Sequence, residues 1–446
     1  MTRTLWIDVS SSMNNVVWRA SGIQRVELEL ALRLSEETRV EFVRHDAAKQ
    51  RFVVVSADEV RLRHRKLMTE SIASAIVPPS SAAQSAVGRL GSWVAAHVPD
   101  RILPGWLLKL GWRAEERASK ALQSLRRLES KALLTLRSVG TDGVRQERFP
   151  GGVSGDHFLC LTFHYDPAVF KELFEWIRSL QLESTFVIYD MIPSLVPQYS
   201  TLDPAVFDAN VRSVVEEASR LLTISECSAS DIRSFCEREE IECQPISVLH
   251  LASAVTLTEP RRPSSRQPLE NFVLCVGTIE PRKNHQLLLD VWEEFDHEKI
   301  DDVPLLVIAG SSGWLNELTM RRLLTTPELR DKVVFVDSPT DPELHWLYRN
   351  CLFTVFPSHY EGWGLPVTES LDAGKICLAS DSGSLPEAGE GICMHLDPND
   401  RAAWHEAILT LYRDGEQRVR LEDRLRQSRS VRSIDDVAAD LRAIIG

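Results

Sequence analysis

Apolar and polar positions along this chain follow two periods in alternation. Short apolar runs of the kind that form buried strands are followed by segments whose apolar residues recur every three or four positions, as in amphipathic helices. The predicted strands are residues 5–9, 41–44, 51–55, 156–162, 185–189, 221–224, 246–249, 272–276, 305–310, 333–336, 352–356 and 376–379. This rhythm of strand and helix predicts an α/β protein with parallel sheets.

The alternation is interrupted twice. Residues 61–150 contain basic amphipathic sequence with tryptophans in place of strands, and residues 256–270 contain three prolines. The second interruption has the composition of a linker. We therefore predict a first domain over residues 1–255 with an insertion at about 61–150, the linker 256–270, and a second α/β domain over residues 271–430.

Charge is unevenly distributed along the 446 residues. The net charge of −13 argues against a general nucleic-acid binder. Residues 61–150, however, hold 16 Lys/Arg and 7 Asp/Glu, a net charge of +9. The basic segment favours a local anionic partner such as a lipid surface. A helical insertion whose apolar face packs on the first domain explains the same pattern equally well.

The eight cysteines form no C-x-x-C pair and no Cys/His cluster with zinc spacing. Several lie in apolar, strand-like runs, which is typical of small buried residues in a reducing cytosol. The amino terminus lacks the pattern of a signal peptide, and no uncharged run is both long and apolar enough to span a bilayer. We expect a cytoplasmic protein.

The most informative stretch is residues 356–369, where a predicted strand leads through two glycines into a predicted helix. Backbone N–H groups and the helix dipole can hold an anion at such a turn. Two acids, Glu361 and Glu369, flank the turn with seven residues between them. Since ionised carboxylates are strong acceptors, hydrogen bonding to sugar hydroxyls is a natural role for them.

A second turn between strand and helix carries the adjacent cations Arg282 and Lys283. Two such cations can be solvated loop charges or a clamp for a diphosphate. The second anion-ready turn in the same domain favours the clamp. Two cations and two helix dipoles can stabilise a leaving diphosphate without a divalent ion. Because no carboxylate pair in the sequence suits a metal, we expect neither a metal nor a cofactor.

The first domain offers three isolated candidates. Asp190 and His164 follow predicted strands, and functional residues of parallel sheets lie at such carboxyl ends. Each of the two can instead cap a helix or satisfy a loop. Gly22 precedes a predicted helix, where it either lets the backbone approach a ligand or forms a plain turn.

These residues together resemble the retaining glycosyltransferases of family 4, which have the GT-B fold. The resemblance is dense over residues 272–398 and includes the family's E-x7-E motif at Glu361 and Glu369. It implies two Rossmann-like domains facing a cleft, with residues 431–446 crossing back as a helix to the first domain. The resemblance implies that Arg282 and Lys283 bind the donor diphosphate. It implies that Glu361 contacts the transferred sugar and that Glu369 contacts the ribose. The backbone of Gly364 and Leu365 would contact phosphate and sugar. The Gly22 loop would face the donor phosphates or the acceptor.

The amino-acid sequence of residues 360–367 is most similar to that of bacterial mannosyl- and rhamnosyltransferases of O-antigen and surface-polysaccharide synthesis. This implies transfer of a hexose to a lipid-linked or growing glycan at the inner membrane. The first candidate for the hexose is mannose, with GDP-mannose as the donor. Relatives often carry His-Asp where this chain has Tyr189-Asp190, so Asp190 is expected to assist catalysis and His164 to replace the missing histidine. The alternatives are a nucleotide-sugar epimerase or phosphorylase on the same fold, and a non-catalytic glycan- or nucleotide-binding subunit.

Overall fold

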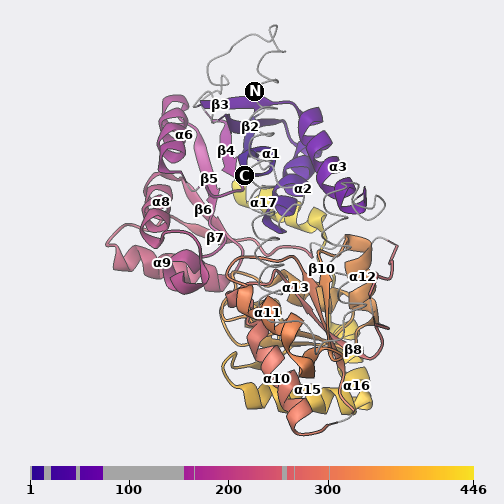
Figure 1. Cartoon of the computed structure of the whole chain (residues 1–446). Coiled ribbons are helices and arrows are strands. Elements are labelled where there is room, and N and C mark those ends of the chain that lie inside the picture. Colours follow the sequence, from indigo (N-terminus) through magenta and orange to yellow (C-terminus); the bar gives the residue numbers. More distant parts are fainter. Residues whose placement is uncertain are drawn as a thin grey trace, which may run out of the picture. The chain divides into compact units, whose positions relative to one another are not determined.

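The computed structural model of the protein describes residues 3–14, 22–46, 51–73, 155–164, 166–253, 259–265, 267–300 and 302–446. Apart from residues 67–73, they belong to one compact unit, which contains two β-sheets (Figure 1). No helix in these ranges is long and apolar enough to cross a membrane. The predicted basic insertion at residues 61–150 lies outside the described residues from residue 74 onward, so its lipid contact stays a prediction.

The first sheet has seven strands in the order β3-β2-β1-β4-β5-β6-β7, and only β2 and β3 are antiparallel neighbours. Its strands are β1 (Leu5–Asp8), β2 (Val40–Asp46), β3 (Arg51–Val55), β4 (His157–Cys160), β5 (Glu183–Val187), β6 (Arg220–Thr223) and β7 (Ile246–Val248). The central strands β1 and β4 are buried at every position. Their parallel register pairs Asp8 with Cys160, so both last residues reach the same edge of the sheet.

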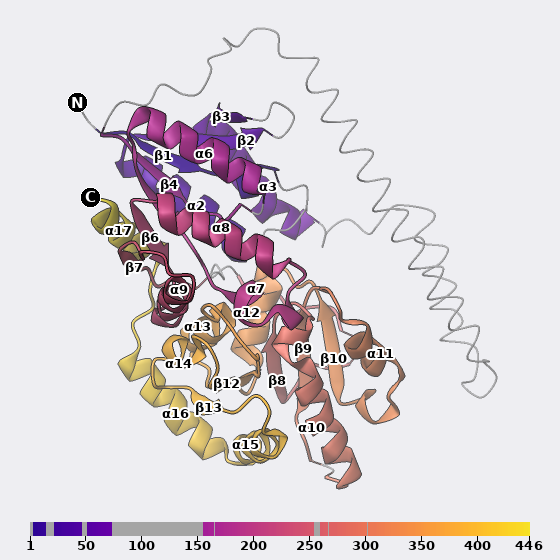
Figure 2. The same ribbon diagram turned by 90° about the vertical axis from the view of Figure 1, so that its left-hand side faces the viewer.

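Helices cover this first sheet because their apolar stripes match its faces. They are α1 (Ser10–Asn14), α2 (Gly22–Glu37), α3 (Ala57–Ala73), α6 (Pro167–Leu180), α7 (Ile192–Leu195), α8 (Pro204–Glu217) and α9 (Glu226–Arg238), with the 3₁₀ turn η1 (Pro197–Tyr199). At the start of α6 the Asp166 carboxylate accepts the N–H of Ala168 at 2.9 Å. Figure 2 shows α6 and α8 side by side across one face of the sheet.

The second sheet has six strands, all parallel, in the order β10-β9-β8-β11-β12-β13. They are β8 (Phe272–Val276), β9 (Leu305–Gly310), β10 (Val333–Asp337), β11 (Thr354–Phe356), β12 (Cys377–Ser380) and β13 (Met394–Leu396). The uninterrupted apolar runs of β8 and β9 bury both of their faces, as a parallel sheet covered on two sides requires.

Helices of the second sheet are α10 (His285–His297), α11 (Glu317–Thr325), α12 (Asp341–Asn350), α13 (Leu365–Asp372), α14 (Leu385–Ala388), α15 (Arg401–Arg413) and α16 (Gly415–Ser428), with the 3₁₀ turns η2 (Pro281–Lys283) and η3 (Pro327–Leu329). The largest side chains of the core on one face are Trp292 of α10 and Trp404 of α15, both fully buried. Each indole N–H donates to a backbone carbonyl, Pro304 and Asp397 respectively, at 2.9 Å, which removes the cost of burying it.

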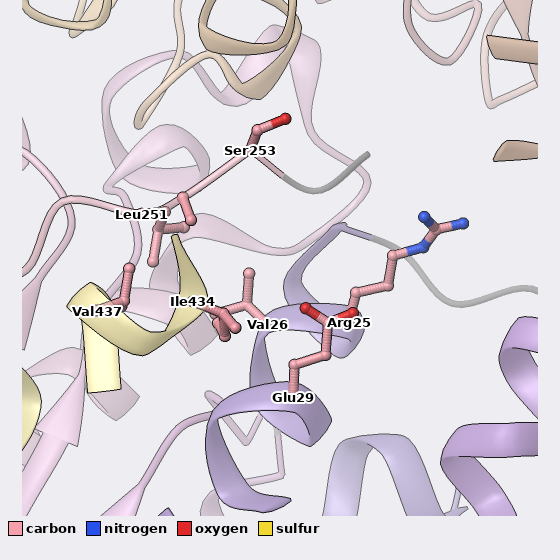
Figure 3. A pocket seen from close by; sticks show the side chains of 8 residues that line it. Arg25, Val26, Glu29, Leu251, Ser253, Ile434 and Val437 are labelled. Carbon is pink, nitrogen blue, oxygen red and sulfur yellow. The ribbon is translucent and has the colours of Figure 1, made fainter. Parts of the chain in front are cut away.

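The last helix, α17 (Ile434–Ile445), packs against α2 of the first sheet. Val437, Ala438 and Leu441 are fully buried, and burial of a Val or Leu side chain contributes roughly 1.5–3 kcal/mol. Ser433 begins the helix with a capping box that involves Asp436. A small pocket lies where α17, α2 and the segment around Leu251 meet (Figure 3). It contains none of the acids or cations predicted to bind a donor.

The apolar runs predicted strands β1 to β12 to within a few residues, and the short, half-buried β13 was not predicted. The start of α2 is a correction, because Gly22 is the first residue of the helix and not part of a loop. Apolar periodicity had placed Gly22 before the helix. It failed because the first turns bury polar side chains, Gln24 and Glu27, which carry no apolar signal.

Candidate active site

The loop between β11 and α13 brings Glu361 to the carboxyl-terminal edge of the second sheet. Two serines hold the carbonyl groups of this loop. Ser384 Oγ donates to the carbonyl oxygens of Glu361 and Trp363 at 2.9 and 2.8 Å, and Ser380 Oγ donates to the carbonyl of Ser358 at 2.5 Å. Ser380 and Ser384 are fully buried, as is Ser358. The loop is therefore held rigidly by side chains that follow it by about twenty residues in the chain.

Two glycines in this loop are required by its geometry. Gly364 has φ +111°, which L side chains rarely adopt, and a Cβ there would lie 2.5 Å from Leu385 Cδ2. A Cβ on Gly362 would lie 2.7 Å from Asp190 Cβ and 2.9 Å from the carbonyl oxygen of Tyr189. Gly362 thus allows the loop to approach the segment after β5 of the first sheet closely, and this brings Asp190 beside Glu361.

Glu361 is the centre of a buried ion cluster. Its carboxylate accepts from Lys283 Nζ and from Arg282 Nη1, each at 2.6 Å. Arg282 also donates to Glu280 Oε1 at 2.6 Å through its other terminal nitrogen. The four side chains are 2–13% exposed. We call Glu280, Arg282, Lys283 and Glu361 the Glu361 cluster, which combines two cations with two acids.

The turn that carries the two cations is fixed to the Glu361 loop. Asn284, in the left-handed conformation with φ +54°, ends η2 and donates its side-chain amide to the carbonyls of Pro357 and Pro398 at 3.1 and 2.8 Å. The N–H of His359 donates to the carbonyl of Arg282 at 2.8 Å. The cations are thus held in position through the backbone as well as through their own ion pairs.

The two glutamates of the E-x7-E motif have opposite electrostatic environments. Burial alone raises the pKa of Glu361, but Arg282 and Lys283 outweigh it and lower this pKa to about 2. Burial also raises the pKa of Glu369, where the only hydrogen-bond donor among the described residues is the Tyr348 hydroxyl at 2.7 Å, and the pKa reaches about 7. These pKa values leave Glu361 ionised at neutral pH, whereas Glu369 titrates near neutrality.

Asp190 lies within the electrostatic reach of the Glu361 cluster. Burial raises its pKa, while the N–H of Ile192, which donates at 3.0 Å, and the charge of Arg282 lower it. The structure therefore brings Asp190 together with Glu361 and Arg282, three residues that the sequence proposed separately. The backbone N–H groups of Gly364 and Leu365 at the start of α13 have no hydrogen-bond partner among the described residues, so they can donate to an anion.

His164 is not brought into this group. Its Nε2 lies 2.5 Å from Asp8 Oδ2, and its ring packs edge-on against Phe52 and Phe170. No hydrogen bond or ion pair within the described ranges links His164 to Asp190 or to Glu361. His164 is instead the ion-pair partner of Asp8. The expectation that His164 replaces the histidine that relatives carry before Asp190 therefore finds no support in these contacts. Gly22 begins α2 three residues before Arg25, which forms a two-pronged ion pair with Asp341 of α12 at 2.8 and 3.0 Å.

Several residues of the site were not predicted. Glu280 accepts from Arg282, and the Tyr348 hydroxyl donates to Glu369. In the sequence Glu280 is an ordinary loop acid, and Tyr348 occupies an apolar position of a helix. His250 stacks on Trp363 with ring centroids 5.0 Å apart, and its Nε2 lies 2.8 Å from a Glu387 oxygen. Glu387 also accepts the N–H of Glu226 at the start of α9. Nothing local in the sequence indicates these contacts.

Comparison with known proteins finds a family model that matches part of this chain. Residues 258–428, which include the Glu361 cluster and Glu369, match the family model "Glycosyl transferases group 1". O-antigen chain mannosyltransferase B of Escherichia coli is 28% identical over 228 residues, 49% of this chain and 58% of that protein. GDP-mannose:cellobiosyl-diphosphopolyprenol alpha-mannosyltransferase of Xanthomonas oryzae pv. oryzae is 32% identical over 115 residues, 25% of this chain and 30% of that protein. The chain thus spans less than two thirds of each of these curated relatives.

Among solved structures, HepE of Anabaena in complex with UDP-glucose is similar to this chain with a TM-score of 0.56. The superposition covers 100% of both chains at 13% sequence identity. The coverage is the same, at 12% identity, for the HepE structure that contains UDP and glucose as separate molecules. At this identity the likeness shows the fold alone, which is GT-B. The fold and the family resemblance predicted from the sequence are therefore confirmed, while the roles of individual site residues stay predictions.

Proposed function

Because the chain carries a glycosyl transferases group 1 domain over residues 258–428, we propose that it is a retaining, metal-independent hexosyltransferase. The donor is a nucleotide sugar, with GDP-mannose the first candidate. The acceptor is a lipid-linked or growing surface glycan, reached from the cytoplasmic side of the inner membrane. The observation that carries the proposal is the convergence of Arg282 and Lys283 on Glu361 beside the open N–H groups of Gly364 and Leu365.

Electrostatics support a diphosphate at this place. In the Glu361 cluster, Arg282 offers a planar fork and Lys283 a point charge, the two forms of cation that bind phosphate oxygens best. The start of α13 adds backbone donors and a positive helix dipole. A bound diphosphate would share the cations with Glu361, whose remaining acceptor positions then hydrogen-bond the sugar hydroxyls.

The reaction we propose needs no protein nucleophile. The bond between C1 of the sugar and the β-phosphate oxygen breaks, and its electron pair stays on that oxygen. The acceptor hydroxyl oxygen forms the new bond to C1 on the same face, and its proton passes to the same phosphate oxygen. Arg282, Lys283 and the α13 N–H groups stabilise the charge that develops on the diphosphate. Asp190, from the opposite sheet, orients the acceptor or the sugar.

The choice of donor and acceptor rests on the relatives. Both named proteins are mannosyltransferases, and the name of the second contains GDP-mannose and a diphosphopolyprenol acceptor. Glu369, which hydrogen-bonds Tyr348 and titrates near neutrality, is the proposed ribose ligand.

The proposal is tested first with donors alone. We expect GDP-mannose to raise the melting temperature of the purified protein more than UDP- or dTDP-sugars do, because a ligand that binds only the folded state stabilises it. Incubation with GDP-mannose and a lipid-linked glycan should then yield an α-linked product from the α-linked donor, read by the anomeric coupling in NMR. A β-linked product would overturn retention.

The variant Glu361→Gln separates the alternatives. It keeps both cations, so we expect donor-induced stabilisation to persist while sugar transfer falls by roughly 10²-fold or more. Unchanged glycan synthesis in cells that carry only this variant would support a non-catalytic binding subunit. Conversion of the donor without any acceptor would identify an epimerase instead.

A further inference from the structure

Three chemically reactive side chains meet at the carboxyl-terminal edge of the first sheet, away from the Glu361 cluster in the sequence, and a buried acid lies within their electrostatic reach. Asp8 ends β1 and Cys160 ends β4, its neighbour in register. His164 follows four residues after Cys160, and Glu27 comes from the second turn of α2. We call Asp8, Glu27, Cys160 and His164 the Asp8 cluster. Asp8, Glu27 and Cys160 are completely buried.

Asp8, Cys160 and His164 each place one ligand atom close to those of the other two, while the Cys160 thiol also donates to the carbonyl of Thr162 at 2.8 Å. Asp8 Oδ2 lies 2.5 Å from His164 Nε2 and 3.6 Å from Cys160 Sγ. The three ligand atoms lie within 4.8 Å of one another, and they are the only such set of three in the described residues. The other Asp8 oxygen is held by Ser10, whose N–H donates to it at 2.9 Å, so Oδ2 is the oxygen left to face the two partners.

The distance from Cys160 to Asp8 fits a tetrahedral zinc ion, and the distance from Asp8 to His164 is shorter than such an ion requires. A sulfur at about 2.3 Å and an oxygen at about 2.0 Å from such an ion lie about 3.5 Å apart, close to the separation of Cys160 Sγ and Asp8 Oδ2. Two ligands at about 2.0 Å lie about 3.3 Å apart. His164, in the loop after β4, would therefore move outward by less than about 1 Å.

A second observation points to a missing partner. Glu27 accepts from Ser12 Oγ at 2.7 Å through Oε2, but its Oε1 is buried without any hydrogen-bond partner. Thr162, on the segment between Cys160 and His164, also has a buried hydroxyl without a partner. Buried polar atoms in folded proteins are almost always paired. The open Glu27 oxygen, within the electrostatic reach of Asp8, and the open Thr162 hydroxyl, between Cys160 and His164 in the chain, are therefore unexpected in a finished core.

The charge of a divalent cation suits this place. The described part of the chain brings no Lys or Arg into hydrogen-bond contact with Asp8, Glu27 or Cys160. The Asp8 carboxylate and the Cys160 thiolate carry two negative charges, which balance those of a Zn²⁺ ion, and a neutral His164 imidazole adds none. The thiol proton and the Nε2 proton leave to solvent as the ion enters. A soft sulfur, a nitrogen and an oxygen together are the donor set that favours zinc over magnesium or calcium.

We propose that Asp8, Cys160 and His164 form a structural zinc site in the first domain, with Glu27 offering an oxygen to the fourth position. The ion would join β1, β4 and α2 at the edge of the sheet that faces ligands in parallel α/β folds. The proposed transfer reaction does not use this ion, since none of these residues belongs to the Glu361 cluster.

The test is cobalt and zinc binding by the full-length protein. After treatment with a chelator, the wild-type protein should take up one equivalent of Zn²⁺, measured by elemental analysis after gel filtration. Co²⁺ in its place should give a near-ultraviolet thiolate-to-cobalt band and the intense visible bands of a tetrahedral ion. Both metals should raise the melting temperature.

Cys160→Ser should abolish the thiolate band, and His164→Gln should weaken zinc uptake at least tenfold. The matched control is Cys236→Ser, because Cys236 is equally buried but lies on α9 outside the Asp8 cluster. It should keep both the band and the stoichiometry. Circular dichroism shows whether each variant is folded. If Cys160→Ser is not folded, Asp8→Asn replaces it as the variant that removes a ligand.

Absence of zinc uptake by the folded wild-type protein, or a thiolate band that survives in Cys160→Ser, would overturn the site. Asp8 and His164 would then be a metal-free ion pair. Neither outcome bears on the nucleotide-sugar proposal, because the donor-induced melting shift is measured separately.

Discussion

The two buried charge clusters of the protein occupy the same place in their respective sheets and are opposite in chemistry. The Glu361 cluster lies near the carboxyl ends of β8 and β11, the central pair of the second sheet. The Asp8 cluster lies at the carboxyl ends of β4, the middle strand of the first sheet, and of its neighbour β1. One contains Arg282 and Lys283 with open N–H groups at a helix start. The other contains two acids, a thiol and an imidazole.

The comparison shows that topology places a site and side chains decide its ligand. Parallel strands bring their carboxyl ends to one edge in both sheets, so each forms a location for polar residues. The cations and the α13 dipole make the second sheet's location suitable for an anion. Two fully buried acids that no Lys or Arg of the described residues contacts through a hydrogen bond make the first sheet's location suitable for a cation.

The largest expected effect is on the anion side. Arg282→Ala removes one of two cations and leaves Glu361 and Glu280 with less compensation, so kcat/KM for sugar transfer should fall roughly 10²–10³-fold. Arg261→Ala is the control, because Arg261 pairs with Glu343 in the same domain but is about 43% exposed. Equal losses in the two variants would contradict a phosphate role for Arg282.

The next effect is the pH dependence contributed by Glu361. Its pKa is lowered to about 2 in the folded protein, so its stabilisation is fully present above its ordinary value and is lost as pH falls through 2. The contribution is about 3 kcal/mol above pH 5. Urea unfolding of wild type and Glu361→Gln should therefore show a stability difference that shrinks from pH 5 to pH 3. A constant difference would show that the ion pairs are not formed in solution.

Glu369 should give the opposite sign. Its pKa is raised to about 7, so the folded protein keeps a proton that the unfolded chain releases near pH 4.5. The free energy of unfolding therefore falls by up to about 3 kcal/mol as pH rises from 4.5 through 7. Glu369→Gln lacks this loss and should gain stability relative to wild type between pH 5 and pH 8. If wild type and variant respond in parallel to pH, Glu369 is ionised throughout.

The smallest effect tests how Glu369 is held. Tyr348→Phe removes the hydroxyl that donates to Glu369 at 2.7 Å, and we expect the KM for the donor to rise about tenfold with little change in kcat. Tyr412→Phe is the matched control, since its hydroxyl donates to Asp302 on the surface. A fall in kcat alone would mean that Tyr348 acts on the transition state and not on ribose binding.

The sequence carried much of this in local signals. Apolar runs located the strands of both sheets because a fully buried parallel strand needs uninterrupted apolar sequence. The Glu361 loop was recognisable because two glycines, two acids and a helix start lie within fourteen residues. Gly22 was misplaced because the first turns of α2 bury Gln24 and Glu27, and apolar periodicity cannot register buried polar residues.

By itself the sequence determined the α/β architecture and the resemblance to a glycosyltransferase family, and it proposed the acids and cations of a donor site, since each depends on residues close together in the chain. Only the tertiary structure decided their chemistry. Glu361 and Glu369 are identical side chains eight positions apart, yet Arg282 lowers the pKa of one while burial raises that of the other. Asp8 and Cys160 are 152 residues apart and meet only through strand register. Charge interactions depend on distance in space, and the fold sets that distance.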